Sequence, residues 1–260
     1  MLNQSLGLFE IIVCDDASTD RTPQIIQSYA ARFPKVIKPV FHQVNQGIAA
    51  NFNSGLAATN GDYISVCAGD DFWHSEKIEK ELTQLQQTPT AKWVYSKSAI
   101  YIHETGHTRP FQRKFDGATG DILFEVLTRQ MSLRNWLAEA SLVREAGWFD
   151  ESLKCFEDWD YKIRLAKHAQ AAYCPNMTVY YRRQRKQTAS SDSIGNMSSK
   201  AQVQNKHREL LCQLEESQAA YIENVWQQDL VLSRPSARLA RTLIRKLLKA
   251  TGLSNVKSSD

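Results

Sequence analysis

Residues 9–26, FEIIVCDDASTDRTPQII, decide the fold of this 260-residue chain. The stretch begins with a short apolar run that is rich in β-branched residues, which predicts a strand. Asp15 and Asp16 follow the run, and Thr22 and Pro23 then open a segment whose apolar residues recur with helical spacing. The stretch therefore predicts a strand, a loop that starts with two acidic residues, and a helix.

The same alternation continues along the chain. Further strands are expected at 36–41, 63–67 and 92–102, and helices at 47–58, 75–87, 120–129, 142–147 and 157–168. Alternating strands and helices are typical of an α/β fold, here Rossmann-like, with a mostly parallel sheet flanked by helices. From about residue 198 the sequence becomes helical and polar. We therefore predict a domain at 1–195 and a helical C-terminal appendage at 196–260.

Composition excludes several classes of protein. The net charge is only +4 and the hydrophobic content is 42%, so the chain is globular and nothing demands nucleic acid as a partner. The five cysteines form no C-x-x-C pair, which favours a reducing compartment. The chain has no signal-peptide pattern and no apolar run of about 18 residues that could span a membrane. We expect a cytoplasmic protein.

Two acidic pairs follow predicted strands, Asp15-Asp16 after the first and Asp70-Asp71 after the third. Ligands of open α/β sheets bind at the carboxyl ends of the strands, so both pairs should project over one edge of the sheet. Gathered carboxylates repel one another unless a cation or hydrogen-bond donors compensate, and carboxylate oxygens suit Mg²⁺ or Mn²⁺. The alternative, that each pair only caps a helix or forms a turn, stays open.

Four segments, in this order, carry a resemblance to a known family. They read FEIIVCDDASTDRT (9–22), NQGIAANFNSGLAATNGDYI (45–64), CAGDDFWHSEKIEKEL (67–82) and GWFDESLKCFEDWDYKIRLA (147–166). Over about residues 3–185 the chain resembles the family 2 glycosyltransferases of the GT-A fold. The CAGDDFW form resembles a branch found among bacterial enzymes of cell-surface polysaccharide synthesis.

The resemblance implies an inverting transferase that moves a sugar from a nucleotide diphosphate sugar, by default a UDP-sugar, to a hydroxyl of a saccharide or lipid-linked acceptor. Mg²⁺ or Mn²⁺ would stabilise the charge on the leaving diphosphate. The implied site residues are Asp158 as the catalytic base, Asp15, Asp16 and Asp70 for the donor, and Asp71 with Asp70 for the metal. We further expect Trp148, Glu157 and Trp159 to line the acceptor pocket, and Arg182 and Arg183 to close over the donor diphosphate. The alternatives are that Glu157 and Asp158 only cap a helix and that the two arginines are simply solvated.

The resemblance also predicts a difference at the start of the chain. Members of the family normally have a strand, a turn and a helix before the segment that begins here at about Asn3, and we expect this chain to lack them. That expectation leaves a second hypothesis open, a non-catalytic member that binds a sugar nucleotide or a partner protein.

A third hypothesis comes from His103-Glu104-Thr105-Gly106-His107, which matches the H-E-x-x-H signature of zinc hydrolases. That signature works only on a helix, where the two histidines share a face. The preceding residues are strand-like and Gly106 interrupts the motif, so we expect a hairpin turn here.

The tail carries one further pattern. Residues 234–249 combine leucines with six basic residues, as interfacial helices on anionic lipid do. This pattern favours peripheral contact with the inner face of the plasma membrane, and an ordinary docking helix is the alternative.

Overall fold

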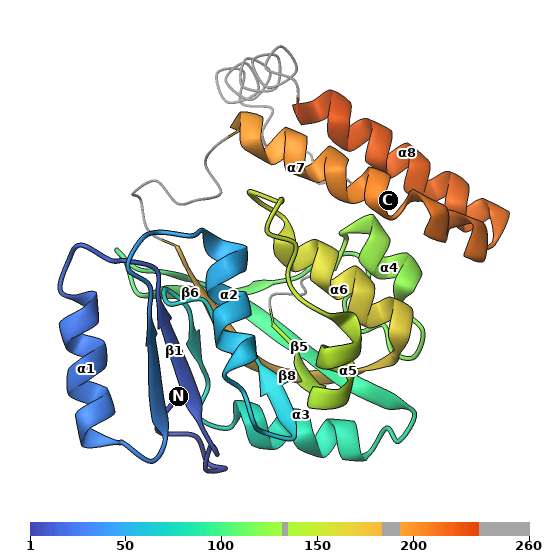
Figure 1. Ribbon diagram of the computed structural model, residues 1–260. Coiled ribbons are helices and arrows are strands. Elements are labelled where there is room, and N and C mark those ends of the chain that lie inside the picture. Colours follow the sequence, from blue (N-terminus) through green and yellow to red (C-terminus); the bar gives the residue numbers. More distant parts are fainter. Residues whose placement is uncertain (132–134, 184–192, 234–260) are drawn as a thin grey trace. The chain divides into compact units, whose positions relative to one another are not determined.

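The computed structural model describes residues 1–131, 135–183 and 193–233 (Figure 1). The chain divides into two compact units, residues 1–191 and 192–260. The sequence predicted a boundary at 195/196, and the division lies at 191/192. No helix in the described ranges is both long enough and apolar enough to cross a membrane.

The first unit begins with a small parallel sheet. It contains β1 (Ile11–Asp15) and β2 (Ile37–Phe41), joined by α1 (Thr22–Arg32), with Ile11 opposite Ile37. Helix α2 (Ile48–Ala57) packs on β1, and Figure 1 shows α1 and α2 on opposite sides of the two strands. A Cβ on Gly55 would lie 3.1 Å from Sγ of Cys14, so this glycine lets α2 approach the strand closely.

The larger sheet runs in the order β3 (Tyr63–Ser65), β7 (Leu137–Glu139), β5 (Ala91–Ile102), β8 (Gln170–Arg183) and β4 (Phe72–Trp73), and β6 (His107–Phe111) also pairs with β5. The prediction of a mostly parallel sheet was wrong for this part of the chain. Only β5 and β8 pair in parallel, and the other pairs are antiparallel. The reason is that short strands such as β6 return through a tight turn, whereas parallel pairing needs a long crossover.

Helices surround this sheet in the first unit. They are α3 (Lys77–Gln86), α4 (Leu123–Thr128), α5 (Ala140–Ala146) and α6 (Glu157–His168). Helix α6 contacts both α4 and α5. The second unit contains α7 (Ser193–Lys206), the 3₁₀ helix η2 (Arg208–Gln213) and α8 (Glu216–Ser233), so its described residues are helical as predicted. The basic segment predicted at 234–249 lies outside the described residues.

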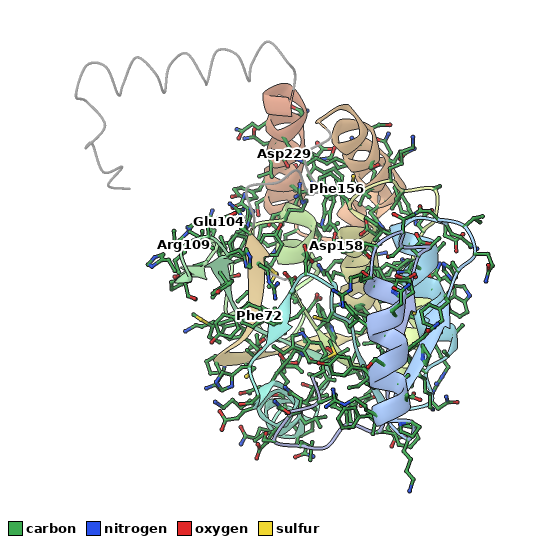
Figure 2. All side chains as sticks on the ribbon, turned by 90° about the vertical axis from the view of Figure 1, so that its left-hand side faces the viewer. Phe72, Glu104, Arg109, Phe156, Asp158 and Asp229 are labelled. Carbon is green, nitrogen blue, oxygen red and sulfur yellow. The ribbon has the colours of Figure 1, made fainter. Side chains whose placement is uncertain are left out.

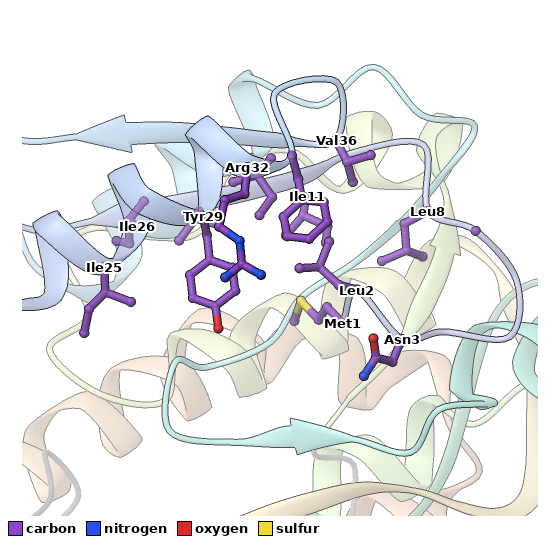
Figure 3. A pocket seen from close by; sticks show the side chains of 14 residues that line it. Met1, Leu2, Asn3, Leu8, Ile11, Ile25, Ile26, Tyr29, Arg32 and Val36 are labelled. Carbon is purple, nitrogen blue, oxygen red and sulfur yellow. The ribbon is translucent and has the colours of Figure 1, made fainter.

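An open hollow of about 760 Å³ lies between the N-terminal residues and α1 (Figure 3). Its walls include Met1, Leu2, Ile11, Ile25 and Tyr29. Four of these five side chains are apolar, and none of the residues that line it belongs to the predicted site. The hollow is therefore separate from the acidic residues that the sequence singled out.

A buried carboxylate lies at the centre of the larger sheet. Glu81 of α3 is fully buried, and its Oε2 accepts a hydrogen bond from the equally buried Lys77 at 2.5 Å. Its Oε1 accepts three more, from Ser96 of β5 at 2.8 Å, Thr178 of β8 at 2.9 Å and Asn135 at 3.0 Å. One carboxylate thus joins α3 to two neighbouring strands and to the segment before β7.

Lys77 extends the same network to two further strands. Its Nζ donates to Oγ of Ser65 in β3 at 3.1 Å and lies 4.4 Å from the ring centre of Trp73 in β4. The ammonium group is therefore compensated by a carboxylate, a hydroxyl and an aromatic face. Such compensation is what allows a buried ion pair to persist.

We expect Glu81→Ala to lower the free energy of unfolding by about 3–5 kcal/mol, because it leaves the Lys77 ammonium buried without its counter-ion. The matched control is Glu76→Ala, since Glu76 forms an exposed pair with Lys80 on the same helix at 2.8 Å, and such pairs contribute about 1 kcal/mol or less. Urea unfolding followed by tryptophan fluorescence measures both. Equal losses in the two variants would contradict the role of the buried pair.

Candidate functional site

The first acidic pair ends β1 and begins a tight loop. Ala17 has a φ of 59°, so the backbone turns sharply directly after the pair. Asp15 is buried, and its carboxylate accepts a hydrogen bond from the backbone N–H of Ser18 at 3.1 Å. Asp15 therefore shapes this loop from within.

Asp16 holds a second loop, at residues 42–47. Its carboxylate accepts hydrogen bonds from the backbone N–H groups of Gln46 at 2.8 Å and Gly47 at 2.9 Å, and from Nδ1 of His42 at 2.9 Å. Burial alone would raise the pKa of Asp16, but these donors outweigh it and lower the pKa below its ordinary value. Asp16 is thus an ionised carboxylate fixed at the end of β1.

His42 connects this carboxylate to α2. Its Nε2 lies 2.9 Å from Oγ of Ser54, and the Ser54 hydroxyl also lies 3.1 Å from the carbonyl of Ala50. Because an ionised carboxylate only accepts hydrogen bonds, Nδ1 of His42 carries a proton. Neither His42 nor Ser54 was predicted from the sequence, since no local motif reveals a contact across 26 residues.

The second acidic pair lies in the turn before β4. Asp71 donates its backbone N–H to the carbonyl of Ala68 at 3.1 Å, and its Oδ1 accepts a hydrogen bond from the backbone N–H of Arg182 at 3.0 Å. Asp70 is exposed beside it. Burial raises the pKa of the neighbouring Cys67 thiol to about 12, and the charge of Asp71 is the second cause. Cys67 is therefore not a nucleophile at neutral pH.

Arg182 and Arg183 end β8 next to this pair. The Arg182 guanidinium lies 5.7 Å from the ring centre of Phe72, and its Nε is buried without a hydrogen-bond partner. Arg183 is exposed, with its guanidinium 5.7 Å from the ring centre of Tyr181. A buried N–H donor without an acceptor is costly, so this position of Arg182 suits an anionic ligand.

The third acidic pair begins α6. Phe156, the residue just before the helix, has a φ of 65° and a ψ of 16° in the left-handed region, at a cost of roughly 1–2 kcal/mol for a residue other than glycine. Asp158 is half-exposed, and its Oδ2 accepts a hydrogen bond from Lys162, one turn later, at 2.6 Å. The side chain of Lys162 is itself buried, so the ion pair links a buried lysine to a half-exposed carboxylate.

Glu157, next to Asp158, has a raised pKa. It is buried, and burial, followed by the charge of Asp158, raises the pKa of Glu157 to about 7. Adjacent carboxyls at the start of α6 therefore lie in unlike environments. Asp158 is half-exposed and paired with a lysine, whereas Glu157 exchanges its proton near neutral pH.

The three residues predicted for an acceptor pocket separate in the structure. Trp148 is 59% exposed, whereas Trp159 is 5% exposed and donates its indole N–H to the carbonyl of Val126 at 2.8 Å. The expectation that Trp159 lines an open pocket is therefore wrong, because its polar edge binds α4 inside the core. Trp148 remains available to a ligand, and Glu157 is buried.

Contacts through α2 connect the Asp16 loop to α6. Asn53 of α2 accepts a hydrogen bond from the backbone N–H of Phe149 at 2.8 Å and donates to the carbonyl of the same residue at 3.0 Å. The Phe149 ring stacks on Phe52 at 5.2 Å and on Tyr161 of α6 at 4.1 Å. Phe149 thus links α2 to the helix that carries Asp158.

The H-E-x-x-H motif forms no metal site. His103 lies in the turn after β5, and His107 begins β6 opposite Ile102, so the two histidines share no helical face. Across the ranges 1–131, 135–183 and 193–233, no three His, Cys, Asp or Glu side chains gather as metal ligands. The zinc hydrolase hypothesis is therefore wrong.

Comparison with known proteins identifies relatives of this chain. Residues 1–137 match the family described as "Glycosyl transferase family 2". An uncharacterized protein of Mycobacterium tuberculosis is 32% identical over 185 residues, which cover 67% of this chain and 50% of the relative. The uncharacterized glycosyltransferase YwdF of Bacillus subtilis is 30% identical over 186 residues, covering 68% of this chain and 65% of YwdF. The chain thus spans about half the length of its mycobacterial relative.

Solved structures show the same fold. Superposition on S. aureus TarS 1–349 gives a TM-score of 0.63 at 18% identity, over 86% of this chain and 64% of the other. A TarS 1–349 structure in complex with UDP-GlcNAc gives 0.65 at 18% identity, over 89% of this chain and 65% of the other. This likeness confirms the predicted α/β fold of the GT-A type.

The raised pKa of Glu157 predicts a pH-dependent stability. Between its ordinary value of 4.5 and about 7, the folded protein retains a proton that the unfolded chain releases, so rising pH destabilises the folded state. Glu157→Gln stays neutral. We expect the free energy of unfolding of Glu157→Gln, relative to that of wild type, to rise by about 2–3 kcal/mol from pH 4 to pH 8 in urea unfolding. Asp62→Asn, at an exposed carboxyl, is the control, and parallel pH profiles for all three proteins would contradict the prediction.

Proposed function

The chain belongs to glycosyl transferase family 2, and from this premise we propose that it moves a sugar from a nucleotide diphosphate sugar to a hydroxyl group of its acceptor, with inversion at the anomeric carbon. The observation that carries the proposal is the contact between Asp71 and the backbone of Arg182 at 3.0 Å. It joins a carboxylate that can bind a cation to a residue whose guanidinium can bind phosphate.

We propose a uridine diphosphate sugar as the donor. TarS, which shares the fold, has been solved with UDP and with UDP-GlcNAc. In this chain Asp16 uses three of the roughly four acceptor positions of a carboxylate, which leaves one for an N–H group of the base. Asp15 stabilises the loop through its hydrogen bond from Ser18, and the Arg182 guanidinium, whose Nε lacks a hydrogen-bond partner, is the group proposed to bind a phosphate oxygen.

Mg²⁺ or Mn²⁺ fits the second acidic pair as a proposed cofactor. Asp71, with Asp70 beside it, supplies hard oxygen ligands, and the lack of a third acidic or histidine ligand in the described ranges leaves the other positions to phosphate oxygens and water. The bound ion would stabilise the negative charge that develops on the leaving diphosphate. The chain's own part is to fix Asp71 through the Arg182 backbone, so that the carboxylate is oriented before the donor binds.

Asp158 is the proposed base. Its carboxylate is half-exposed, so an acceptor hydroxyl can reach it, and Lys162 holds it from the buried side. It would take the hydroxyl proton as the oxygen attacks the anomeric carbon, and one such displacement inverts the configuration. The exposed Trp148 offers an apolar face to a saccharide or lipid-linked acceptor. A role in cell-surface polysaccharide synthesis at the inner face of the plasma membrane, with contact through 234–249, remains part of the proposal.

Donor hydrolysis tests the enzyme against a non-catalytic binding protein. We expect Asp158→Asn to slow the release of UDP from UDP-GlcNAc in Mn²⁺ by about 10²–10⁴-fold, because the base is lost. Asp62→Asn, at an exposed carboxyl outside the site, should match wild type. A wild-type rate no higher than that of Asp158→Asn, for this donor and a panel of others, would favour the non-catalytic hypothesis.

Thermal stabilisation tests the metal. With Mn²⁺ present and UDP at about 100 times its Kd under those conditions, we expect the Tm of the wild type to rise by about 5–10 °C above that of the ligand-free protein. Asp71→Asn should lose most of this increase, because an amide is a weaker ligand for a hard cation, while its stabilisation by UDP without metal stays unchanged. A full Mn²⁺-dependent increase in Asp71→Asn would contradict the assignment of Asp71.

A further inference from the structure

The residue before the third acidic pair adopts an unusual backbone conformation. Phe156 occupies the left-handed region, which glycine adopts without penalty and phenylalanine does not. No side chain caps the helix, and the carbonyl of Phe156 instead accepts hydrogen bonds from the backbone N–H groups of Trp159 at 3.1 Å and Asp160 at 3.0 Å. The conformation of Phe156 therefore sets the direction in which the first turn of α6 projects Asp158.

An arginine side chain lies over the Phe156 ring. The guanidinium carbon of Arg129 lies 4.4 Å from the centre of the Phe156 ring and 5.2 Å from the centre of the Trp159 ring. The two rings meet edge to face, 6.4 Å apart and at 82°. Phe156 and Asp158, two residues apart at the start of α6, are both labelled in Figure 2. A cation over two aromatic rings is an attractive contact that is lost when either partner is removed.

Arg129 is fixed in turn by the end of α4. It has a φ of 55°, also left-handed, and its backbone N–H donates to the carbonyl of Val126 at 3.1 Å. The same carbonyl accepts the indole N–H of Trp159 at 2.8 Å. Arg129, at the end of α4, and Phe156, at the start of α6, thus both have left-handed backbones, and the Arg129 guanidinium lies over the Phe156 ring. The Val126 carbonyl accepts hydrogen bonds from both segments.

We propose that Arg129 is a positioning residue for Asp158. Its guanidinium keeps the Phe156 ring against Trp159, this contact holds the left-handed backbone at Phe156, and that backbone aims the carboxylate of Asp158 at the acceptor hydroxyl. The inference rests on the proposed function. Arg129 does not bind the donor, so its removal changes the rate of the reaction and leaves donor affinity unchanged.

The test uses glycine to separate positioning from packing. We expect Arg129→Ala to lower kcat for UDP release from UDP-GlcNAc by about 10–100-fold, as misplacement of a reacting group by about 1 Å does, with KM for the donor within about twofold of wild type. Glycine adopts the left-handed conformation unaided, so adding Phe156→Gly to Arg129→Ala should restore most of the lost kcat. Arg32→Ala is the matched control, because Arg32 also lies over two rings, Tyr29 at 5.2 Å and Phe33 at 5.5 Å.

Three results would overturn the proposal: an unchanged kcat in Arg129→Ala, a loss confined to KM, or a double variant as slow as Arg129→Ala. Urea unfolding midpoints measured alongside show whether a slow variant is folded, and a folded double variant with recovered kcat supports positioning. Failure of the proposed function has a different signature, namely a wild-type rate equal to that of Asp158→Asn.

Discussion

The rest of this structure depends on the buried carboxylate of Glu81. An ionised group in the interior persists only when every acceptor position is satisfied, and four donors from α3, β5, β8 and the segment before β7 satisfy it here. These donors fix the relative positions of the strands that end near the candidate site. The His74 backbone N–H donates to the carbonyl of Thr178 at 2.8 Å, which connects the turn after β4 to the same point of β8.

The acidic side chains that the sequence singled out differ mainly in their surroundings. Asp16 accepts hydrogen bonds from backbone donors and an imidazole, Asp71 accepts one from the Arg182 backbone, Asp158 is paired with a lysine, and burial is the largest influence on Glu157. The same functional group can therefore fix a loop, offer an oxygen to a cation, accept a proton or retain one. Which of these it does follows from burial and from the number of donors within reach.

Local patterns in the sequence predicted much of the fold. The helices predicted at 47–58, 75–87 and 157–168 match α2, α3 and α6 within two residues, because apolar periodicity records which face of a helix is buried. The direction of most strand pairs in the larger sheet was predicted wrongly, and β8 was not predicted, because periodicity does not identify a strand's partner. Within the site, His42, Arg129 and the burial of Trp159 depend on contacts between distant residues, which no local motif records.

The register of β8 against β5 is uneven near Thr178. Ser96 and Ser98 of β5 lie opposite Cys174 and Val179, so β8 holds four residues where β5 holds only Lys97. The extra length brings the Thr178 hydroxyl to the Glu81 carboxylate and leaves Arg182 beside Asp71. Because successive side chains of a strand alternate between faces, losing one residue here would turn the following side chains to the opposite face. Among descendants of this chain, substitutions in β8 should accordingly be tolerated far more often than insertions or deletions.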